Sequence, residues 1–337
     1  MKQAKPRLPK LPVPASAKVE FGLPALVDAD GAVSRAAFYA CQSLARNTIR
    51  SYNSAWRQVV ARCERWNVCP LPMAPTVAAD LIAGMADDWY EASTIRATLS
   101  VIAKAHRLAG LPSPTDVLLV RDVMRGISRL YGGSPSRQKL AVTADELRGM
   151  AAAAAKRPWP HGIQEWAVIA LTFFCGLRRE ETVALDVEDL EFASDRLTIH
   201  LIKSKKDQYG RGAEVVIERL PDDPQLCPVA AVEAWLEVLG ETSGPLFRRI
   251  YPGNQVQGRL SAWSVAEYVK RFAPAVGLSP ADVGAHSLRA GCVTELKERG
   301  VDDVVIAAHV RHASLQSLQA YYRPRQRRVN IARALLS

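Results

Sequence analysis

Residues 162–181 read GIQEWAVIALTFFCGLRREE, and this stretch sets the character of the second half of the chain. Residues 162–175 are strongly apolar, which predicts a helix that is covered by other elements. Gly176 can end this helix, because glycine readily adopts the backbone conformations found at helix ends. Arg178 follows the glycine, so we expect its side chain at a turn, aimed away from the apolar helix behind it.

The sequence around this helix predicts a mainly α-helical domain over residues 143–337. Thr143 and Glu146 form a capping-box pattern at its start, with Asp145 in the first turn. Residues 196–202 and 213–217 alternate between apolar and polar side chains, which is typical of a β-hairpin. The connection between them, KSKKDQYGRG, is long and basic. We therefore expect helices with one small antiparallel sheet.

The preceding part of the chain predicts a separate helical domain. Residues 1–31 are rich in proline and lysine and indicate an extended tail, residues 32–133 have helical periodicity, and residues 134–142 indicate a linker. Three segments of the helical domain carry an apolar stripe beside a basic one. Such stripes are solvated faces in many proteins, but three in one domain favour a surface that grips phosphates. The candidate DNA-binding residues are Arg46, Arg50, Arg57, Arg96, Lys104, Arg107, Arg121 and Arg125.

Composition sets limits on the class of protein. The chain has 337 residues, 48% of them hydrophobic and 23% charged, as in an ordinary globular protein of two domains. Its net charge of +10 favours a polyanionic partner. No apolar run reaches the ~18 residues of a membrane helix, and the first residues lack a signal peptide, so we expect a cytoplasmic protein. The six cysteines are scattered and do not resemble a zinc site, so we expect reduced thiols.

Three segments of the second domain supply residues suited to phosphoryl transfer. Arg178 lies in the first, and His286 and Arg289 share one helical face in the second. The third runs from His312 to Tyr321, with a predicted helix that begins near Ser314 and carries the tyrosine toward its end. Two guanidiniums can stabilise a pentacovalent phosphorane, and a tyrosine hydroxyl can attack phosphorus. Taken singly, each residue also suits a helix cap, a surface contact or core packing.

Together these segments resemble the tyrosine recombinase, or phage integrase, family and its Cre-like two-domain members. The first family motif is GLR followed by an acidic residue, the second is HxLR followed by glycine, and the third is a histidine nine residues before the tyrosine. The matching residues are Gly176, Leu177, Arg178, Glu181, His286, Leu288, Arg289, Gly291, His312 and Tyr321. The sequence departs from the family pattern at two positions. Arg311 stands where a glycine commonly precedes the histidine of the third motif. In the helical domain the family commonly has a cysteine directly after a tryptophan, whereas here Cys69 lies three residues after Trp66.

The resemblance implies a role for each matching residue. Arg178, His286, Arg289 and His312 would act on the phosphate, Glu181 would support them, and Tyr321 would be the nucleophile. The family lysine lies in a hairpin loop within a sequence similar to residues 204–208. Lys205 is therefore the candidate general acid, and Lys203 and Lys206 remain possible.

The resemblance also implies a fold and a reaction. The fold would be a helical, SAM-like core-binding domain followed by an α+β catalytic domain, whose C-terminal helix docks on a neighbouring protomer. The reaction would be cleavage and rejoining of DNA through a 3′-phosphotyrosine and a Holliday junction, with no metal, ATP or other cofactor. The partner would be double-stranded DNA with inverted half-sites, bound by a protein that is monomeric when free and tetrameric on two sites, in association with the nucleoid. The alternatives are a type IB topoisomerase and a catalytically idle DNA-binding protein.

Overall fold

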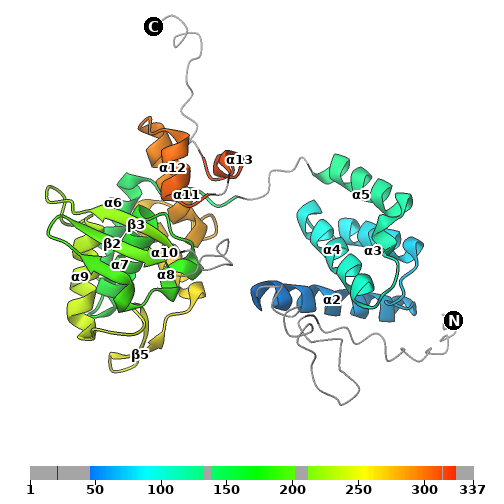
Figure 1. Cartoon of the computed structure of the whole chain (residues 1–337), viewed down its shortest axis with the longest axis horizontal. Helices are drawn as coiled ribbons and strands as arrows, with labels where there is room; N and C mark the ends of the chain where they lie inside the picture. Colours follow the sequence, from blue (N-terminus) through cyan, green and yellow to red (C-terminus); the bar gives the residue numbers. More distant parts are fainter. Residues whose placement is uncertain (1–20, 22–45, 133–137, 202–211, 313, 324–337) are drawn as a thin grey trace, which may run out of the picture. The chain divides into compact units, whose positions relative to one another are not determined.

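The computed structural model describes residue 21 and residues 46–132, 138–201, 212–312 and 314–323. The chain forms two compact units, residues 1–137 and 138–337, shown in Figure 1. The division falls inside the segment 134–142 that the sequence indicates as a linker. Of the predicted extended tail, Phe21 is described, and it is buried in the core of unit 1, where its amide donates to Oδ1 of Asn53 at 2.9 Å. The lysines of the hairpin connection and the predicted C-terminal helix lie outside the described residues.

Unit 1 is helical throughout its described part. Ser113 caps the short helix η2 through its hydroxyl, which accepts a hydrogen bond from the amide of Thr115 at 3.3 Å. The predicted apolar stripes meet in one core, where Trp56 and Cys63 pack with Ile95 and Ile102. The elements are α2 (Arg46–Trp66), α3 (Pro75–Asp87), α4 (Ala92–Leu108), η2 (Pro114–Asp116) and α5 (Leu118–Tyr131).

Unit 2 combines helices with two small sheets. The predicted capping box opens it, since the amide of Thr143 donates to Glu146 at 2.8 Å and the Thr143 hydroxyl accepts from the amide of Glu146. Its helices are α6 (Ala144–Ala154), α7 (His161–Phe174), α8 (Arg179–Ala184), α9 (Pro228–Leu239), α10 (Ala262–Phe272), α11 (Ala285–Glu298), α12 (Asp303–His309) and α13 (Leu315–Gln319), with short helices η3 (Val187–Asp189) and η4 (Ala273–Val276).

The predicted hairpin is confirmed, but the prediction of a single sheet is wrong. Strands β2 (Arg196–Leu201) and β3 (Ala213–Glu218) pair antiparallel, and β1 (Leu190–Phe192) adds a third strand beside β2. A second sheet pairs β4 (Arg248–Tyr251) with β5 (Gln255–Arg259). Both strands of this sheet are short and mostly exposed, so they lack a strong alternating pattern. The turn residues Pro-Gly-Asn between them were the available signal.

Two glycines allow the elements that carry the site to approach closely. Gly176 has φ +53°, and a Cβ placed on it would lie 2.6 Å from the Val310 side chain. A Cβ on Gly291 of α11 would lie 2.0 Å from the carbonyl oxygen of Val142. Neither position can hold a larger residue without moving backbone or buried side chains. Glycine therefore lets the C-terminal end of α7, helix α11 and the end of α12 converge.

Two further observations concern the described residues as a whole. None of their helices is long and apolar enough to span a membrane. Four of the described cysteines are buried and Cys69 is exposed, all of them as free thiols.

Candidate active site

Arg178 lies at the turn predicted for it, as the residue that immediately precedes α8. Its amide donates to Oε2 of Glu181 at 2.9 Å, and its Nη1 donates to Oε1 at 2.5 Å. Glu181 is almost fully buried, and the Arg178 side chain is 15% exposed. One carboxylate thus fixes both the backbone and the side chain of Arg178.

Arg289 is fully buried on α11, which is unusual for a charged side chain. Its Nη1 donates to the carbonyl of Gly176 and its Nη2 to the carbonyl of Val310. Its Nε is buried and has no hydrogen-bond partner among the described residues. Burial, followed by the charge of Arg178, lowers the pKa of Arg289 to about 10, so it is charged at pH 7. The guanidinium is thus anchored by carbonyls and keeps one buried donor to spare.

Tyr321 lies among the other predicted site residues. The ring centroid of His312 is 4.7 Å from that of Tyr321, and the His286 ring is 6.4 Å away. The guanidinium carbon of Arg289 is 5.4 Å from the centre of the Tyr321 ring. The helix predicted to begin near Ser314 is present as α13, but the expectation that it carries the tyrosine toward its end is wrong. Helix α13 ends at Gln319, and Tyr321 follows in a turn, where its amide donates to the carbonyl of Leu318 at 2.9 Å.

The neighbouring Tyr322 faces other residues. The Nζ atom of Lys297 lies 5.0 Å from the centre of the Tyr322 ring. Of the two adjacent tyrosines, Tyr321 is therefore the one that contacts the arginine and histidine cluster.

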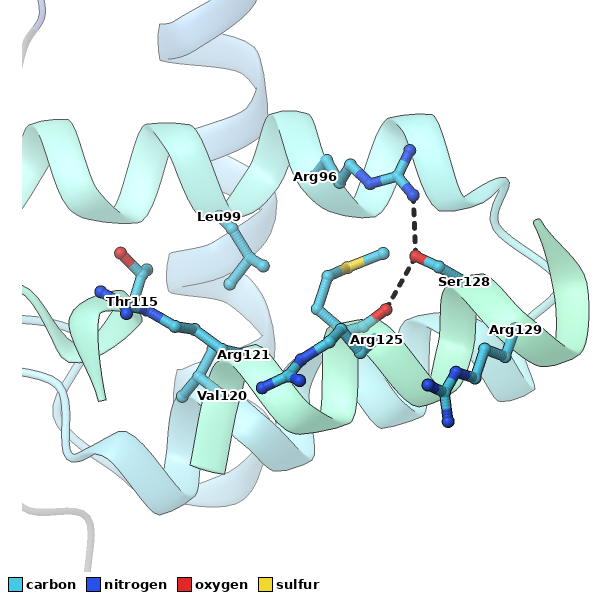
Figure 2. Close-up of a pocket in the computed structure, with 9 residues that line it drawn as sticks. Arg96, Leu99, Thr115, Val120, Arg121, Arg125, Ser128 and Arg129 are labelled. Carbon is cyan, nitrogen blue, oxygen red and sulfur yellow. Dashed lines mark hydrogen bonds between the residues drawn. The ribbon is translucent and has the colours of Figure 1, made fainter. Parts of the chain in front are cut away.

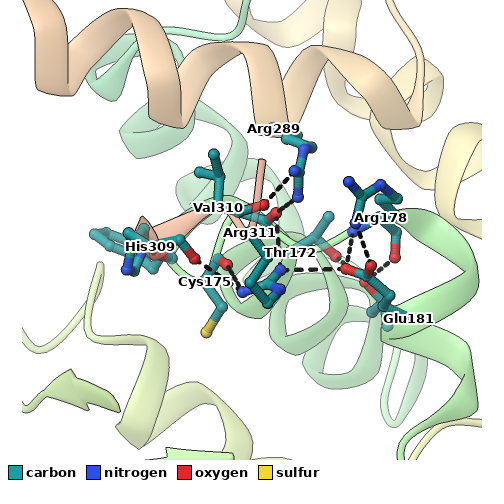
Figure 3. Close-up of polar contacts among 11 residues, drawn as sticks. Thr172, Cys175, Arg178, Glu181, Arg289, His309, Val310 and Arg311 are labelled. Carbon is teal, nitrogen blue, oxygen red and sulfur yellow. Dashed lines mark hydrogen bonds and ion pairs between the residues drawn. The ribbon is translucent and has the colours of Figure 1, made fainter. Parts of the chain in front are cut away.

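Arg311 adds a third guanidinium to this cluster, as Figure 3 shows. Its Nη2 donates to Oε2 of Glu181 at 3.2 Å and to the carbonyl of Gly176 at 3.3 Å. In the sequence, Arg311 stands out only as a departure from the family pattern. The signal that could have identified it was the arginine itself, since a charge replacing glycine beside a site histidine needs a partner.

The histidines of the site are surrounded by positive charge. Desolvation lowers the pKa of His286, and the charges of Arg179, Arg323, Arg289 and Arg178 lower it further. His309, which donates from Nε2 to the carbonyl of Phe174 at 2.8 Å, also has a lowered pKa because of burial. Both imidazoles are therefore neutral at pH 7, and His286 can accept a proton.

The structure thus brings together three separate segments of unit 2, which carry Arg178, Glu181, His286, Arg289, His312 and Tyr321. Lys205, Lys203 and Lys206 lie outside the described residues. Within the described part of the chain, no group of histidine, cysteine and carboxylate side chains is arranged to hold a metal ion.

The predicted DNA-binding residues of unit 1 fall into two sets. Arg96 of α4 and Arg121 and Arg125 of α5 line one cavity of about 510 Å³ with Arg129, as Figure 2 shows. Across it, Nη2 of Arg96 donates to the hydroxyl of Ser128 at 2.7 Å. The others do not line this cavity. Arg50, Arg57 and Arg107 are exposed, Lys104 is half-buried, and the side chain of Arg46 is outside the described residues.

Comparisons with known proteins agree with this geometry. The sequence pattern of the phage integrase family matches residues 141–328. An integrase/recombinase XerD homologue of Selenomonas ruminantium is 30% identical over 284 residues, which cover 83% of this chain and 82% of that protein.

Two solved structures share the fold. The XerH site-specific recombinase, in a post-cleavage complex with a palindromic difH substrate, matches with a TM-score of 0.62 and 16% identity over 91% of this chain and 86% of that one. A lambda integrase tetramer bound to a Holliday junction matches with a TM-score of 0.57 and 17% identity over 86% of this chain and 75% of that one. The chain belongs to the phage integrase family and is a tyrosine recombinase, a DNA strand-cleaving and rejoining enzyme of site-specific recombination.

Proposed function

We propose that this recombinase cleaves DNA by forming a covalent bond between Tyr321 and a 3′-phosphate, and rejoins it through a Holliday junction. The observation that carries the proposal is the position of Tyr321, whose ring centroid lies 4.7 Å from that of His312 and 5.4 Å from the guanidinium carbon of Arg289. A phenol is a weak nucleophile at neutral pH and needs a base or nearby positive charge. The surroundings of Tyr321 supply both kinds of group.

In the first step, the hydroxyl oxygen of Tyr321 attacks the phosphorus, and the bond from phosphorus to the 5′-oxygen breaks. The phenolic proton passes to a neutral imidazole such as His286, whose lowered pKa keeps it unprotonated. The released 5′-hydroxyl of a partner strand reverses the same chemistry. One phosphodiester is replaced by one phosphotyrosine, so the reaction needs no external energy source.

Arg178 and Arg289 would stabilise the negative charge that accumulates on the phosphorane. Both are held by protein acceptors before substrate arrives, so they need little reorganisation during the reaction. The buried Nε of Arg289 lacks a partner among the described residues, and a phosphate oxygen would satisfy it. This spare donor supports a role for Arg289 in binding the reacting phosphate.

Lys205 is proposed as the acid that protonates the departing 5′-oxygen. It lies in the basic connection between β2 and β3. A 5′-bridging phosphorothioate gives a leaving group that needs little protonation, so this substrate should restore cleavage by Lys205→Ala. If it instead restores Lys203→Ala or Lys206→Ala and leaves Lys205→Ala inactive, the role belongs to that other lysine.

We further propose that unit 1 grips the DNA backbone through the arginines of α4 and α5 and of α2. Arg96, Arg121, Arg125 and Arg129 surround one cavity, so several guanidiniums can contact neighbouring phosphates. As in the lambda integrase tetramer bound to a Holliday junction, four copies would assemble, here on two sites that each consist of two inverted half-sites. The C-terminal segment of each copy would dock on a neighbouring copy. Deletion of residues after Arg328 should then weaken cooperative filling of a paired site and leave half-site binding unchanged.

The experiment that tests the proposal begins with duplexes selected by binding from a random library. When a nick lies close to the cleavage site, cleavage releases a short fragment that carries the free 5′-hydroxyl. This fragment diffuses away, so the covalent complex is trapped. The expected result is an adduct on denaturing gels whose tryptic peptide carries the nucleotide on Tyr321. Tight binding without any adduct would favour the idle DNA-binding protein.

A second measurement separates recombination from topoisomerase action. A recombinase should convert two selected sites into four-way junctions and exchanged products, and it should require those sites. Relaxation of supercoiled plasmid that lacks a selected site, with no junction formed, would instead favour a type IB topoisomerase.

A further inference from the structure

Arg311 occupies a backbone conformation that does not suit arginine. It follows α12 with φ +55°, in the left-handed region where glycine is the residue of lowest cost. A side chain there costs about 1 kcal/mol relative to glycine. The contacts of the side chain therefore have to offset a strain that glycine would avoid.

These contacts connect three segments of unit 2. Besides the two donated by Nη2, the Nη1 atom donates to the carbonyl of His309 at 2.9 Å and to that of Cys175 at 3.3 Å. The side chain is only 11% exposed. Arg311 thus holds the end of α12, the turn between α7 and α8, and the buried carboxylate of Glu181 in one arrangement.

Two of the four acceptors also position the arginines assigned to the phosphate. The carbonyl of Gly176 accepts from Arg289 as well as from Arg311, and Oε2 of Glu181 accepts from the amide of Arg178 as well as from Arg311. Arg311 therefore connects an acceptor that holds Arg178 to an acceptor that holds Arg289, as the dashed lines in Figure 3 show.

We propose that Arg311 is a positioning residue of the recombinase, which sets Arg178 and Arg289 at a fixed separation through Glu181 and the Gly176 carbonyl. Each terminal nitrogen of Arg311 already donates to two protein acceptors, whereas each terminal nitrogen of Arg289 donates to one, so the role assigned to Arg311 requires no phosphate contact. The two guanidiniums must grip one phosphorane together, so their relative placement affects the transition state more than it affects binding. The role rests on the proposed function of Arg178 and Arg289.

The charge of Arg311 gives the proposal a second observable. Burial alone would raise the pKa of Glu181, but the hydrogen bond from the Arg178 amide and the charges of Arg311 and Arg178 bring it below its ordinary value. The charged groups that face this carboxylate are Arg178, Arg311 and, from α11, Arg289. Removal of Arg311 therefore raises the pKa of Glu181, and Glu181 loses its charge at a higher pH.

The test compares Arg311→Gly and Arg311→Lys with the wild-type chain. Glycine removes the guanidinium and suits the backbone, whereas lysine keeps the charge and the strain but can reach fewer acceptors at once. Arg248→Lys is the matched control, because Arg248 is 13% exposed and also donates to two carbonyls and pairs with a carboxylate, away from the site. Single-turnover cleavage of the selected nicked duplex is measured at saturating protein, with binding affinity measured separately.

We expect Arg311→Gly to slow cleavage on the order of tenfold, as for a small misplacement of reacting groups, with affinity nearly unchanged. When the cleavage rate is measured against pH, the loss of rate in acid should begin at a higher pH in Arg311→Gly than in the wild type. Arg311→Lys should restore this pH dependence but only part of the rate. Arg248→Lys should match the wild type in both. In a Glu181→Gln background, the further change to Arg311→Gly should have a much smaller effect. Wild-type cleavage by Arg311→Gly, or equal losses in affinity and rate, would overturn the proposal.

A measurement without DNA separates this proposal from the proposed function. Carbon-13 NMR of labelled glutamate in the free protein should show a higher pKa for Glu181 in Arg311→Gly than in the wild type. If the wild-type chain forms no adduct, the proposed function fails while the carboxylate titration still tests the link from Arg311 to Glu181. An unchanged Glu181 titration would overturn the link, whatever the cleavage assay shows.

Discussion

The arginines of α5 in unit 1 and the arginines around Glu181 in unit 2 differ in how they are held. Arg121, Arg125 and Arg129 are exposed, and the ion pair between Arg125 and Asp122 on this face is open to solvent. Arg289 is fully buried, and its terminal nitrogens both donate to backbone carbonyls. The first set can follow the shape of a nucleic acid backbone, whereas the second is fixed before any substrate binds.

This difference indicates a division of labour between affinity and catalysis. Exposed guanidiniums exchange water and counterions for phosphates, so each contributes to binding in a way that salt weakens. Buried guanidiniums have already lost their hydration, so they favour a more highly charged transition state over the ground state. Substitutions in the two units should therefore separate the binding constant from the cleavage rate.

The largest expected effect is at Tyr321. Tyr321→Phe removes the attacking oxygen and keeps the ring that contacts His312 and Arg289, so the adduct should disappear while DNA binding persists. Tyr322→Phe is the control, because Tyr322 contacts Lys297 instead of the cluster. Adduct gels and gel shifts measure the two properties. An adduct that survives in Tyr321→Phe and is lost in Tyr322→Phe would reverse the assignment.

The next effect concerns the buried arginines. Arg289→Lys keeps a positive charge but loses the fork that reaches Gly176 and Val310, so cleavage should fall by roughly two decades or more. Affinity should change far less, which single-turnover rates and equilibrium binding can establish together. Arg178→Lys should behave in the same way. If affinity and rate fall in parallel, these residues are ordinary phosphate anchors and the division between the units is wrong.

A smaller effect is expected in unit 1. Arg121→Gln should weaken binding and reduce the slope of log affinity against log salt by about one, the contribution of a single phosphate contact. The cleavage rate at saturating protein should stay at the wild-type level. Titrations at several salt concentrations measure the slope. A wild-type slope in Arg121→Gln combined with Arg125→Gln would remove this face of α5 from the DNA interface.

The smallest effect is a loss of stability in mild acid. His106 of unit 1 accepts a hydrogen bond from the amide of Met73 at 2.9 Å, and burial lowers its pKa, as it does for His309 in unit 2. A histidine that is harder to protonate when folded makes stability fall as pH drops through its unfolded pKa of 6.5. Thermal melts should therefore be flat above pH 7 and fall below it. In His106→Gln, the melting temperature of unit 1 should depend less on pH below pH 7. An unchanged dependence would contradict the role of His106 in this loss of stability.

Much of the site could be predicted because its chemistry is carried by residue types and spacings. The motif around Gly176 and Arg178 and the nine-residue spacing from His312 to Tyr321 identified the cluster before any contact was known. Helix periodicity likewise identified the stripes that meet in the core of unit 1. The predicted end of the helix that precedes Tyr321 was wrong, because a segment of ten residues holds too little periodicity to fix where a helix ends.

The sequence by itself therefore determined the helical class, the glycine-bounded turn at Arg178, the hairpin of β2 and β3 and the set of residues that we propose to react. Only the tertiary structure decided how these residues are supported. The second sheet, the burial of Arg289 against two carbonyls and the bridge of Arg311 to Glu181 all depend on segments more than a hundred residues apart or on elements too short to show a pattern. Local spacing records which side chains share a helix face, but the partners of a buried charge are chosen by the packing of the whole unit.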